Sequence, residues 1–439
     1  MDKQEFTRRR KRLMEVIGQG GIAIVPTSPV RIRNRDVEFP YRPDSDFYYL
    51  TGFPEPGAVA VFVPGRAHGE YILFCRERDP ERETWDGRRA GLEGACRDYG
   101  ADDAFPITDL DEILPGLMED KARVYYTMGN DADFDHRVMN WVTLVRGRGR
   151  AGVRAPEEFI ALGHVLHDMR LFKSKAEIAA MRKAGEISAA AHRRAMRVCK
   201  PGMNEHQIEA ELQHAFMTGG ARSWAYPPIV GGGANGCILH YRDNNAPLKD
   251  GDLLLIDAGA EYDSYAADIT RTFPVNGRYT PAQREVYEIV LEAQQAAIDK
   301  IEPGNHWNEP HEAAIRTVTR GLVDLGILKG RLPALIKDEA YKPYYMHRTG
   351  HWLGMDVHDV GDYKIGGEWR VFEPGMVLTV EPGLYLKAGA PGVPKRYGNI
   401  GIRIEDDVLV TRDGREVLST DAPKTIKEVE LAMSMRRAA

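Results

Sequence analysis

Acidic side chains end or interrupt apolar, β-like segments at four places in the second half of this chain. Asp257 closes the apolar run 253–256, and Asp268 follows a short way along. Glu381 ends the run 377–380, and Glu405 lies in an Ile-Arg-Ile-Glu string. Burying a carboxylate without a partner is strongly unfavourable. Any fold that packs these segments must therefore bring compensating charge to them.

Divalent metal ions would supply that charge. A single strand-end acid more often caps a turn or pairs with a lysine, but Arg271 and Arg403 cannot neutralise four carboxylates. His351, in a Thr-Gly-His-Trp string, adds an imidazole. Oxygen-rich ligation without thiolate suits Mn²⁺, Co²⁺ or Mg²⁺ better than structural zinc. Two ions roughly 3.5–4 Å apart can hold a bridging water and polarise a carbonyl, so the set predicts hydrolysis.

Composition limits the remaining classes of protein. The 439 residues are too many for one ordinary core, so we expect two domains. A net charge of −6 disfavours nucleic acid as a partner, and no apolar stretch approaches the roughly 18 residues of a membrane span. The charged N-terminus lacks the apolar core of a secretory signal. Four scattered cysteines predict reduced thiols and a cytoplasmic protein.

The first part of the chain, residues 1–172, predicts an α/β domain. Short β-rich runs occur at 21–26, 58–63, 71–75 and 123–126, and helical or loop segments separate them. The glycine- and arginine-rich stretch 147–152 predicts a loop. Residues 171–174 are the expected passage into a second domain, 173–439.

Helices and strands alternate in this second domain. Capping boxes at Ser174 and Asn204 predict helices over 178–198 and 208–217. Thr280 followed by proline predicts a helix to about residue 301, and 310–325 predicts another. Strands are expected over 252–258, 266–273, 376–380 and 400–410, with the Asp257 and Asp268 segments pairing across a turn at 261–264.

Two familiar patterns do not apply. Residues 231–236 fit the glycine spacing of a dinucleotide-binding loop, but Cys237 to Tyr241 predicts a strand where that motif requires a helix. His347 and His351 have the spacing of a zinc-protease helix, but no glutamate follows His347 and Gly350 weakens any helix. Neither a nucleotide site nor a zincin site is predicted.

Other side chains near the ligand strings are candidates for substrate contact or support. His240, His347 and His358 lie close to these strings in sequence, although a lone histidine is more often structural. Arg403 lies two positions before Glu405, so both point to the same face of a strand. It could orient that carboxylate or form an ordinary ion pair.

Taken together, these strings resemble the M24 "pita-bread" metallopeptidases, and most closely the bacterial aminopeptidase P group. The resemblance includes Ile-Asp-Ala-Gly at 256–259, the run 268–274, His351 to Asp359, Thr-Val-Glu-Pro-Gly at 379–383, and 401–406. The strings 39–42, 45–53 and 236–241 extend it to nearly the whole chain. It implies an N-terminal α/β domain followed by a C-terminal domain with a curved antiparallel sheet and flanking helices.

The resemblance also implies roles for individual residues. The centre would hold two divalent ions, usually manganese, with Asp257 on one ion, Asp268 and Glu405 bridging, and His351 and Glu381 on the other. Attack by a hydroxide bridging the ions would remove the residue before proline, with Glu381 accepting its proton. The remaining substrate and catalytic contacts would come from His240, His347, His358, Tyr385 and Arg403.

Members of this group are commonly homodimers or homotetramers. In such an assembly Asp36 and Trp85 would be the contributors from a neighbouring subunit. Arg348 and Thr349 depart from the group, whose members often carry smaller or apolar residues between the two histidines. The main alternative is a prolidase, which cuts only Xaa-Pro dipeptides and shares all the ligands. A non-catalytic binding protein or a creatine hydrolase of the same fold would be expected to lack them.

Overall fold

A computed structural model describes residues 1–435 and divides the chain into two compact units, Met1–Met169 and Arg170–Ala439. The sequence-based boundary, between residues 172 and 173, lies just beyond this division, inside the passage that follows helix α7 (Gly163–Leu171). Among the described residues, no helix is long and apolar enough to cross a bilayer. All four cysteines are free thiols.

The first unit is an α/β sandwich around a six-stranded sheet, in the order β6-β5-β4-β1-β7-β8. Strands β1, β7 and β8 run parallel, β5 and β6 run parallel, and β4 is antiparallel to both its neighbours. The bounds are β1 (Gly21–Pro26), β4 (Val59–Phe62), β5 (Tyr71–Cys75), β6 (Asp103–Pro106), β7 (Arg123–Tyr125) and β8 (Glu158–Ile160).

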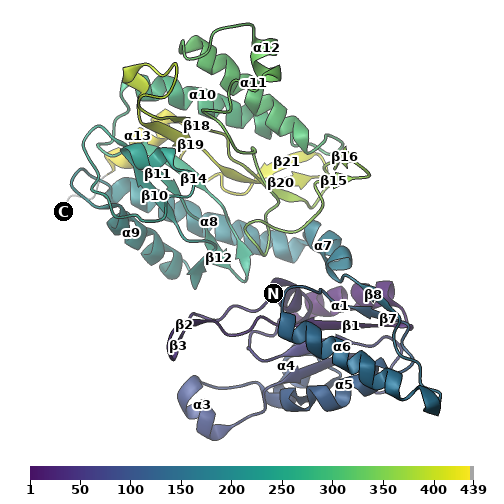
Figure 1. Cartoon of the computed structure of the whole chain (residues 1–439). Coiled ribbons are helices and arrows are strands. Elements are labelled where there is room, and N and C mark those ends of the chain that lie inside the picture. Colours follow the sequence, from purple (N-terminus) through teal and green to yellow (C-terminus); the bar gives the residue numbers. More distant parts are fainter. Residues whose placement is uncertain (436–439) are drawn as a thin grey trace. The chain divides into compact units, whose positions relative to one another are not determined.

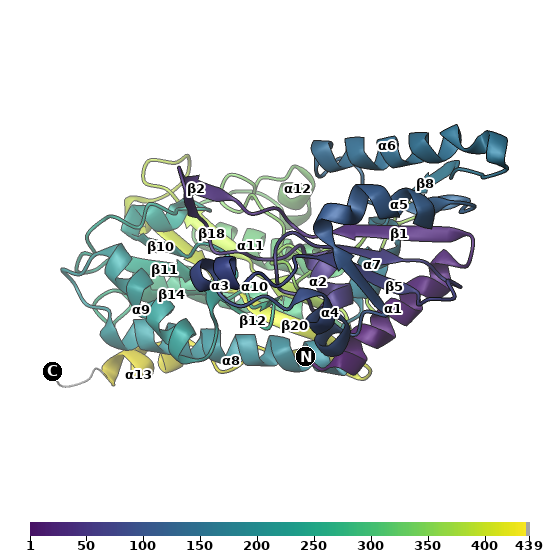
Figure 2. The ribbon, with the colours of Figure 1, turned by 90° about the horizontal axis from the view of Figure 1, so that it is seen from below.

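Helices cover both faces of this sheet (Figure 2). One face packs on α5 (Leu110–Met118) and α6 (Ala132–Gly147), where Leu114 and Trp141 join the core. The others are α1 (Lys3–Ile17), α2 (Ser45–Thr51), α3 (Pro80–Asp86) and α4 (Gly91–Tyr99), with a hairpin of β2 (Ile32–Asn34) and β3 (Val37–Glu38). The stretch 147–152 is a helix end followed by a short 3₁₀ helix, Gly149–Ala151, where a loop was predicted.

The second unit places short antiparallel strands between two helix pairs (Figure 1). The pairs are α8 (Lys175–Val198) with α9 (Glu205–Thr218), and α10 (Pro281–Ile298) with α11 (Asn308–Asp324). Capping boxes at Ser174, Asn204 and Thr280 begin three of these helices, as predicted. Shorter helices are α12 (Leu332–Lys337) and α13 (Ile426–Ser434).

The strands of the second unit form small sheets, all with antiparallel pairing. The central ones are β10-β11-β14, β17-β20-β21 and β18-β19. Their bounds are β10 (Ile229–Gly232), β11 (Leu253–Asp257), β14 (Thr270–Pro274), β17 (Val377–Val380), β18 (Gly383–Leu386), β19 (Ile400–Arg403), β20 (Asp406–Thr411) and β21 (Gly414–Val417). The rest are β9 (Ser223–Trp224), β12 (Ala260–Tyr262), β13 (Tyr265–Ala266), β15 (Lys364–Ile365) and β16 (Glu368–Trp369).

Candidate metal centre and substrate pocket

Two of the predicted ligands lie at the ends of neighbouring strands. Asp257 is the last residue of β11 and pairs with Thr270, the first residue of β14, in the predicted antiparallel arrangement. Asp268 lies just before β14, whereas the sequence placed it inside a strand. Its backbone N–H donates to both carboxylate oxygens of Asp407, at 3.2 and 3.1 Å. Its own carboxylate is therefore carried on a fixed backbone segment, close to Asp257.

Glu405 lies at a break between strands. The prediction of one strand over 400–410 was wrong, because β19 ends at Arg403 and β20 begins at Asp406, in a different sheet. The break occurs because the backbone of Glu405 bonds across to β14: its N–H donates to the Thr270 carbonyl at 3.0 Å. Arg271 Nη1 donates to the Glu405 carbonyl at 2.6 Å. Thr270 Oγ1 then donates to Glu405 Oε2 at 2.6 Å.

Backbone hydrogen bonds between residues 349–351 and residues 379–381 place both His351 and Glu381. The Glu381 N–H donates to the Thr349 carbonyl at 2.8 Å, and the Thr379 N–H to the His351 carbonyl at 2.9 Å. Gly350 permits this approach, since a Cβ there would lie 2.0 Å from the Thr379 carbonyl oxygen.

Two further glycines allow equally close approaches around the centre. A Cβ on Gly259 would lie 1.6 Å from the Ala267 carbonyl oxygen, next to Asp268. A Cβ on Gly401 would lie 2.2 Å from the Gly236 carbonyl oxygen, under the loop that carries His240. Glycine is therefore required at these positions for reasons of space.

The five predicted ligands converge. Asp268, His351 and Glu405 each offer a ligand atom within 4.8 Å of the others. His351 Nε2 lies 3.4 Å from Asp268 Oδ2 and 3.8 Å from Glu381 Oε1. The Tyr226 hydroxyl donates to Asp257 Oδ1 at 2.6 Å and also to Asp268 Oδ1, which joins these two carboxylates.

The electrostatics of the cluster show a deficit of positive charge. Burial raises the pKa of Asp268 and of Glu405 well above the ordinary range, and each is raised further by neighbouring carboxylates. Burial and the Glu405 charge raise the pKa of Glu381 to about 8. Carboxyl groups that resist ionisation in this way fit a site that receives cations. The donor set therefore fits divalent metal ions.

Arg403 connects the cluster to one of the predicted substrate histidines. Its Nη2 donates to Asp257 Oδ2 at 2.6 Å and its Nη1 to the Tyr385 hydroxyl at 3.0 Å. That hydroxyl lies 2.8 Å from His347 Nε2. Burial, followed by the Arg403 charge, lowers the pKa of His347 to about 4, so the ring is neutral at physiological pH. Tyr385 is buried and lies behind His347.

A cavity of about 710 Å³ opens above the cluster, entirely within the second unit. His240, His347, His351 and His358 all line it, together with Asp257, Asp268, Glu381, Arg403 and Glu405. Tyr385 does not belong to its lining. His358 packs edge-on against His351, with ring centroids 4.4 Å apart. The remaining wall is Leu239, Trp307, Arg348, Gly350, Tyr363, Lys364 and Trp369.

The loop that carries His240 is held by a buried carboxylate on α9. Residues 237–241 do not form the predicted strand, because a short 3₁₀ helix (Gly233–Cys237) and a turn occupy this region. Glu205 accepts from the Gly232 N–H and Asn235 Nδ2 with one oxygen, and from the Tyr241 hydroxyl and Ala246 N–H with the other. Glu205 therefore fixes the chain on both sides of His240.

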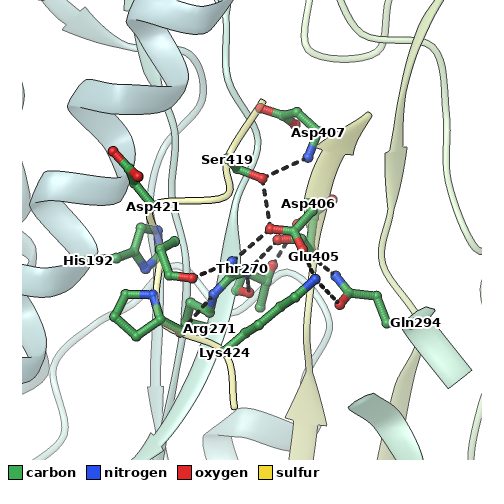
Figure 3. Close-up of polar contacts among 12 residues, drawn as sticks. His192, Thr270, Arg271, Gln294, Glu405, Asp406, Asp407, Ser419, Asp421 and Lys424 are labelled. Carbon is green, nitrogen blue, oxygen red and sulfur yellow. Dashed lines mark hydrogen bonds and ion pairs between the residues drawn. The ribbon is translucent and has the colours of Figure 1, made fainter. Parts of the chain in front are cut away.

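A second charged network lies next to Glu405, around Asp406 (Figure 3). Asp406 accepts from Arg271 Nη2 and from Lys424 Nζ, each at 2.7 Å. Gln294 and Ser419 complete its hydrogen bonds. Burial alone would raise the pKa of Asp406, but the Arg271 and Lys424 charges hold it below the ordinary value.

Sequence reasoning missed Tyr226, Thr270, Asp407 and Glu205. Each acts through a contact with a residue distant in sequence, and none lies in a spacing pattern that identifies its role. Asp36, in the turn between β2 and β3, and Trp85, on α3, belong to the first unit. Both elements project from the same end of that unit (Figures 1 and 2), and Trp85 is 87% exposed.

Comparison with known proteins agrees with this arrangement. The model of metallopeptidase family M24 matches residues 179–412, and that of the aminopeptidase P N-terminal domain matches residues 6–125. The chain is 46% identical to the Xaa-Pro aminopeptidase of Escherichia coli, covering 100% of this chain and 99% of the relative. It is 35% identical to human Xaa-Pro aminopeptidase 3, covering 98% and 86%.

Solved structures give the same picture. The aminopeptidase PepP of Pseudomonas aeruginosa matches with a TM-score of 0.98 and 60% identity, over 99% of this chain and 98% of that one. A substituted Escherichia coli aminopeptidase P in complex with substrate matches with a TM-score of 0.97 and 46% identity, over 100% of both chains.

Proposed function

The chain belongs to metallopeptidase family M24 and carries the N-terminal domain of aminopeptidase P, and on that premise we propose that it is a metal-dependent Xaa-Pro aminopeptidase. It removes the first residue from peptides with proline at the second position. The convergence of five ligand residues on the floor of one peptide-sized cavity carries this proposal.

Asp257, Asp268, His351, Glu381 and Glu405 would hold two divalent ions, which we expect to be Mn²⁺. Such ions, when bound, polarise a carbonyl and make water a nucleophile at neutral pH. Binding through the carbonyl oxygen suits an Xaa-Pro bond. The nitrogen of this tertiary amide has no hydrogen, so the enzyme cannot recognise the bond through an N–H group. The carboxylate-rich floor also attracts the free α-amino group of the substrate.

The protein's own groups handle the protons. Glu381 is placed to accept a proton from the attacking water on a carboxylate oxygen and to deliver it to the leaving proline nitrogen. His347 is neutral and fixed by Tyr385, so it can line the proline pocket without adding charge. His240 and His358 reach the cavity from separate loops, where their rings can donate to the substrate.

The proposal extends to assembly and location. Homodimers or homotetramers would let Asp36 and Trp85 reach a neighbouring site, and the exposure of Trp85 supports this. Free thiols at all four cysteines agree with the expected cytoplasmic location.

Mass spectrometry of peptide products tests the function. The Mn²⁺-loaded chain is given a Gly-Pro dipeptide, an Arg-Pro-Pro-Gly oligopeptide and an all-alanine control, each with and without EDTA. We expect EDTA-sensitive release of only the first residue from the oligopeptide. Cleavage confined to the dipeptide would identify a prolidase, and no cleavage of any peptide would contradict an enzymatic role. Glu381→Gln is the matched variant, and it should release nothing.

A further inference from the structure

Three residues at the mouth of the cavity form a cationic group around one aromatic ring. The Arg348 guanidinium carbon lies 5.0 Å from the centroid of the Trp369 ring. Lys364 Nζ lies 4.3 Å from the same centroid. All three residues line the cavity that contains the ligand cluster. We refer to Arg348, Lys364 and Trp369 as the cationic rim.

The rim is held in place by the backbone. Lys364 and Trp369 face one another in the β15–β16 hairpin. That hairpin is fixed to the loop before α11, because the Trp307 N–H donates to the Arg370 carbonyl at 2.9 Å. Arg348 is held from the side, where Nη2 donates to Asn308 Oδ1 at 2.6 Å.

In the described part of the chain neither cation of the rim has a carboxylate in direct contact, and Glu312 acts on Arg348 through its charge. Within residues 1–435, no carboxylate forms an ion pair with Arg348 or Lys364. Glu368, the acid on the same hairpin, is paired in register with Ile365. Two like charges close to one ring repel each other, so an anion placed between them would be stabilised. Arginine is suited to a carboxylate in particular.

Depth in the cavity shows which part of a peptide reaches the rim. Asp268 and Glu405 are buried, whereas Arg348 and Lys364 are exposed. A peptide whose amino end lies at the acidic floor must therefore extend its residues after proline towards the mouth. From this gradient we infer that the cationic rim binds a carboxylate on the leaving part of the peptide, just after the proline.

That carboxylate has two possible sources, the C-terminus of a short peptide or an acidic side chain in a longer one. The inference rests on the proposed function and specifies its substrates. Two matched pairs separate the sources: Ala-Pro-Gly as the free acid and as the amide, and Ala-Pro-Glu-amide against Ala-Pro-Gln-amide. We expect the charged member of at least one pair to have a KM roughly fivefold lower, with little change in kcat.

Variants assign any such preference to the rim. In the double variant Arg348→Met and Lys364→Met, the KM ratio of the responding pair should fall to about one, because the carboxylate loses both partners. Arg348→Lys alone, in an otherwise native chain, should keep part of the preference, because the position remains cationic. Lys329→Met, an exposed cation outside the cavity, is the control and should leave the ratio unchanged. A preference that survives in the double variant would overturn the inference.

Failure of this inference can be distinguished from failure of the proposed function. Equal KM values within both pairs, with EDTA-sensitive release of alanine intact, would overturn the rim as a carboxylate site and leave the function standing. If no peptide is cleaved, calorimetry with Pro-Leu and Pro-Leu-amide decides the matter. Tighter binding of the acid that disappears in the double variant supports the rim, and equal binding overturns it.

Discussion

Glu405 and Asp406 are adjacent in sequence and equally buried, yet the protein treats their charges in opposite ways. Arg271 and Lys424 neutralise Asp406, and its pKa is held low. Glu405 faces Asp257 and Asp268 with Arg403 as the nearby cation, and its pKa is raised well above the ordinary range. The first is a completed structural network. At Glu405 the compensation is incomplete, as the proposed metal site requires.

The largest expected effect is the loss of peptide hydrolysis when Glu405, and not Asp406, is substituted. Glu405→Gln should lower peptide hydrolysis more than about 100-fold, because even an outer partner of a metal ligand contributes that much. Metal-free thermal stability at neutral pH should rise, since a buried carboxyl that resists ionisation is replaced by a neutral amide. Hydrolysis rates and thermal unfolding in EDTA measure both. A loss of metal-free stability would contradict the view of Glu405 as uncompensated.

The neighbouring substitution should have the opposite effect on stability. Asp406→Asn leaves Arg271 and Lys424 without their carboxylate, at a cost of about 3–5 kcal/mol for breaking a buried pair. We expect thermal unfolding at a lower temperature with or without Mn²⁺. Arg271→Met together with Asp406→Leu removes the pair as a unit and serves as the comparison. If Asp406→Asn were as stable as the parent, the network would not have the structural role assigned to it.

The pH dependence of the stability of the metal-free protein should also show that the carboxylates of the cluster lack compensating positive charge. The folded, metal-free chain keeps Glu381 protonated up to a pKa of about 8, against an ordinary value of 4.5. In that window the folded state binds more protons than the unfolded state, so metal-free stability falls as pH rises. Mn²⁺ removes the effect, and the difference in melting temperature between Mn²⁺ and EDTA should grow with pH. In Glu381→Gln this growth should be smaller; a difference independent of pH would contradict the expectation.

Glu205 is a third kind of buried acid, to be compared with Glu405 and Asp406. Among the described residues its partners are all neutral donors, so hydrogen bonds alone satisfy its two oxygens. Glu205→Gln places an amide where only acceptors fit and should cost about 1–3 kcal/mol. Because this loop carries His240, kcat/KM should fall as well, whereas metal affinity should not change. An equal loss of metal affinity would mean that the effect is general unfolding.

Sequence reasoning predicted helix starts and strands correctly where contacts between residues close in sequence determine them. The capping boxes at Ser174 and Asn204 define helix starts through contacts within three residues, and β1 and β5 follow from short apolar runs. All five expected ligands meet in space, although their roles as ligands remain a proposal.

Sequence reasoning failed where the local structure depends on contacts with residues distant in sequence. The break at Glu405 depends on hydrogen bonds to β14, and residues 237–241 are shaped by Glu205 on another helix. Tyr226 could not be recognised either, because a tyrosine beside two prolines carries no sign that two aspartates will share its hydroxyl. Nothing in a local pattern reports these contacts.

The close backbone approaches at Gly259, Gly350 and Gly401 also limit how this protein can be redesigned. No side chain of any size fits at these positions, since each would meet a carbonyl oxygen within 2.2 Å. A library built to change the accepted peptides should therefore leave the floor of the cavity untouched. Diversity belongs at the mouth, where Arg348 and Lys364 are exposed and can be exchanged without moving a strand.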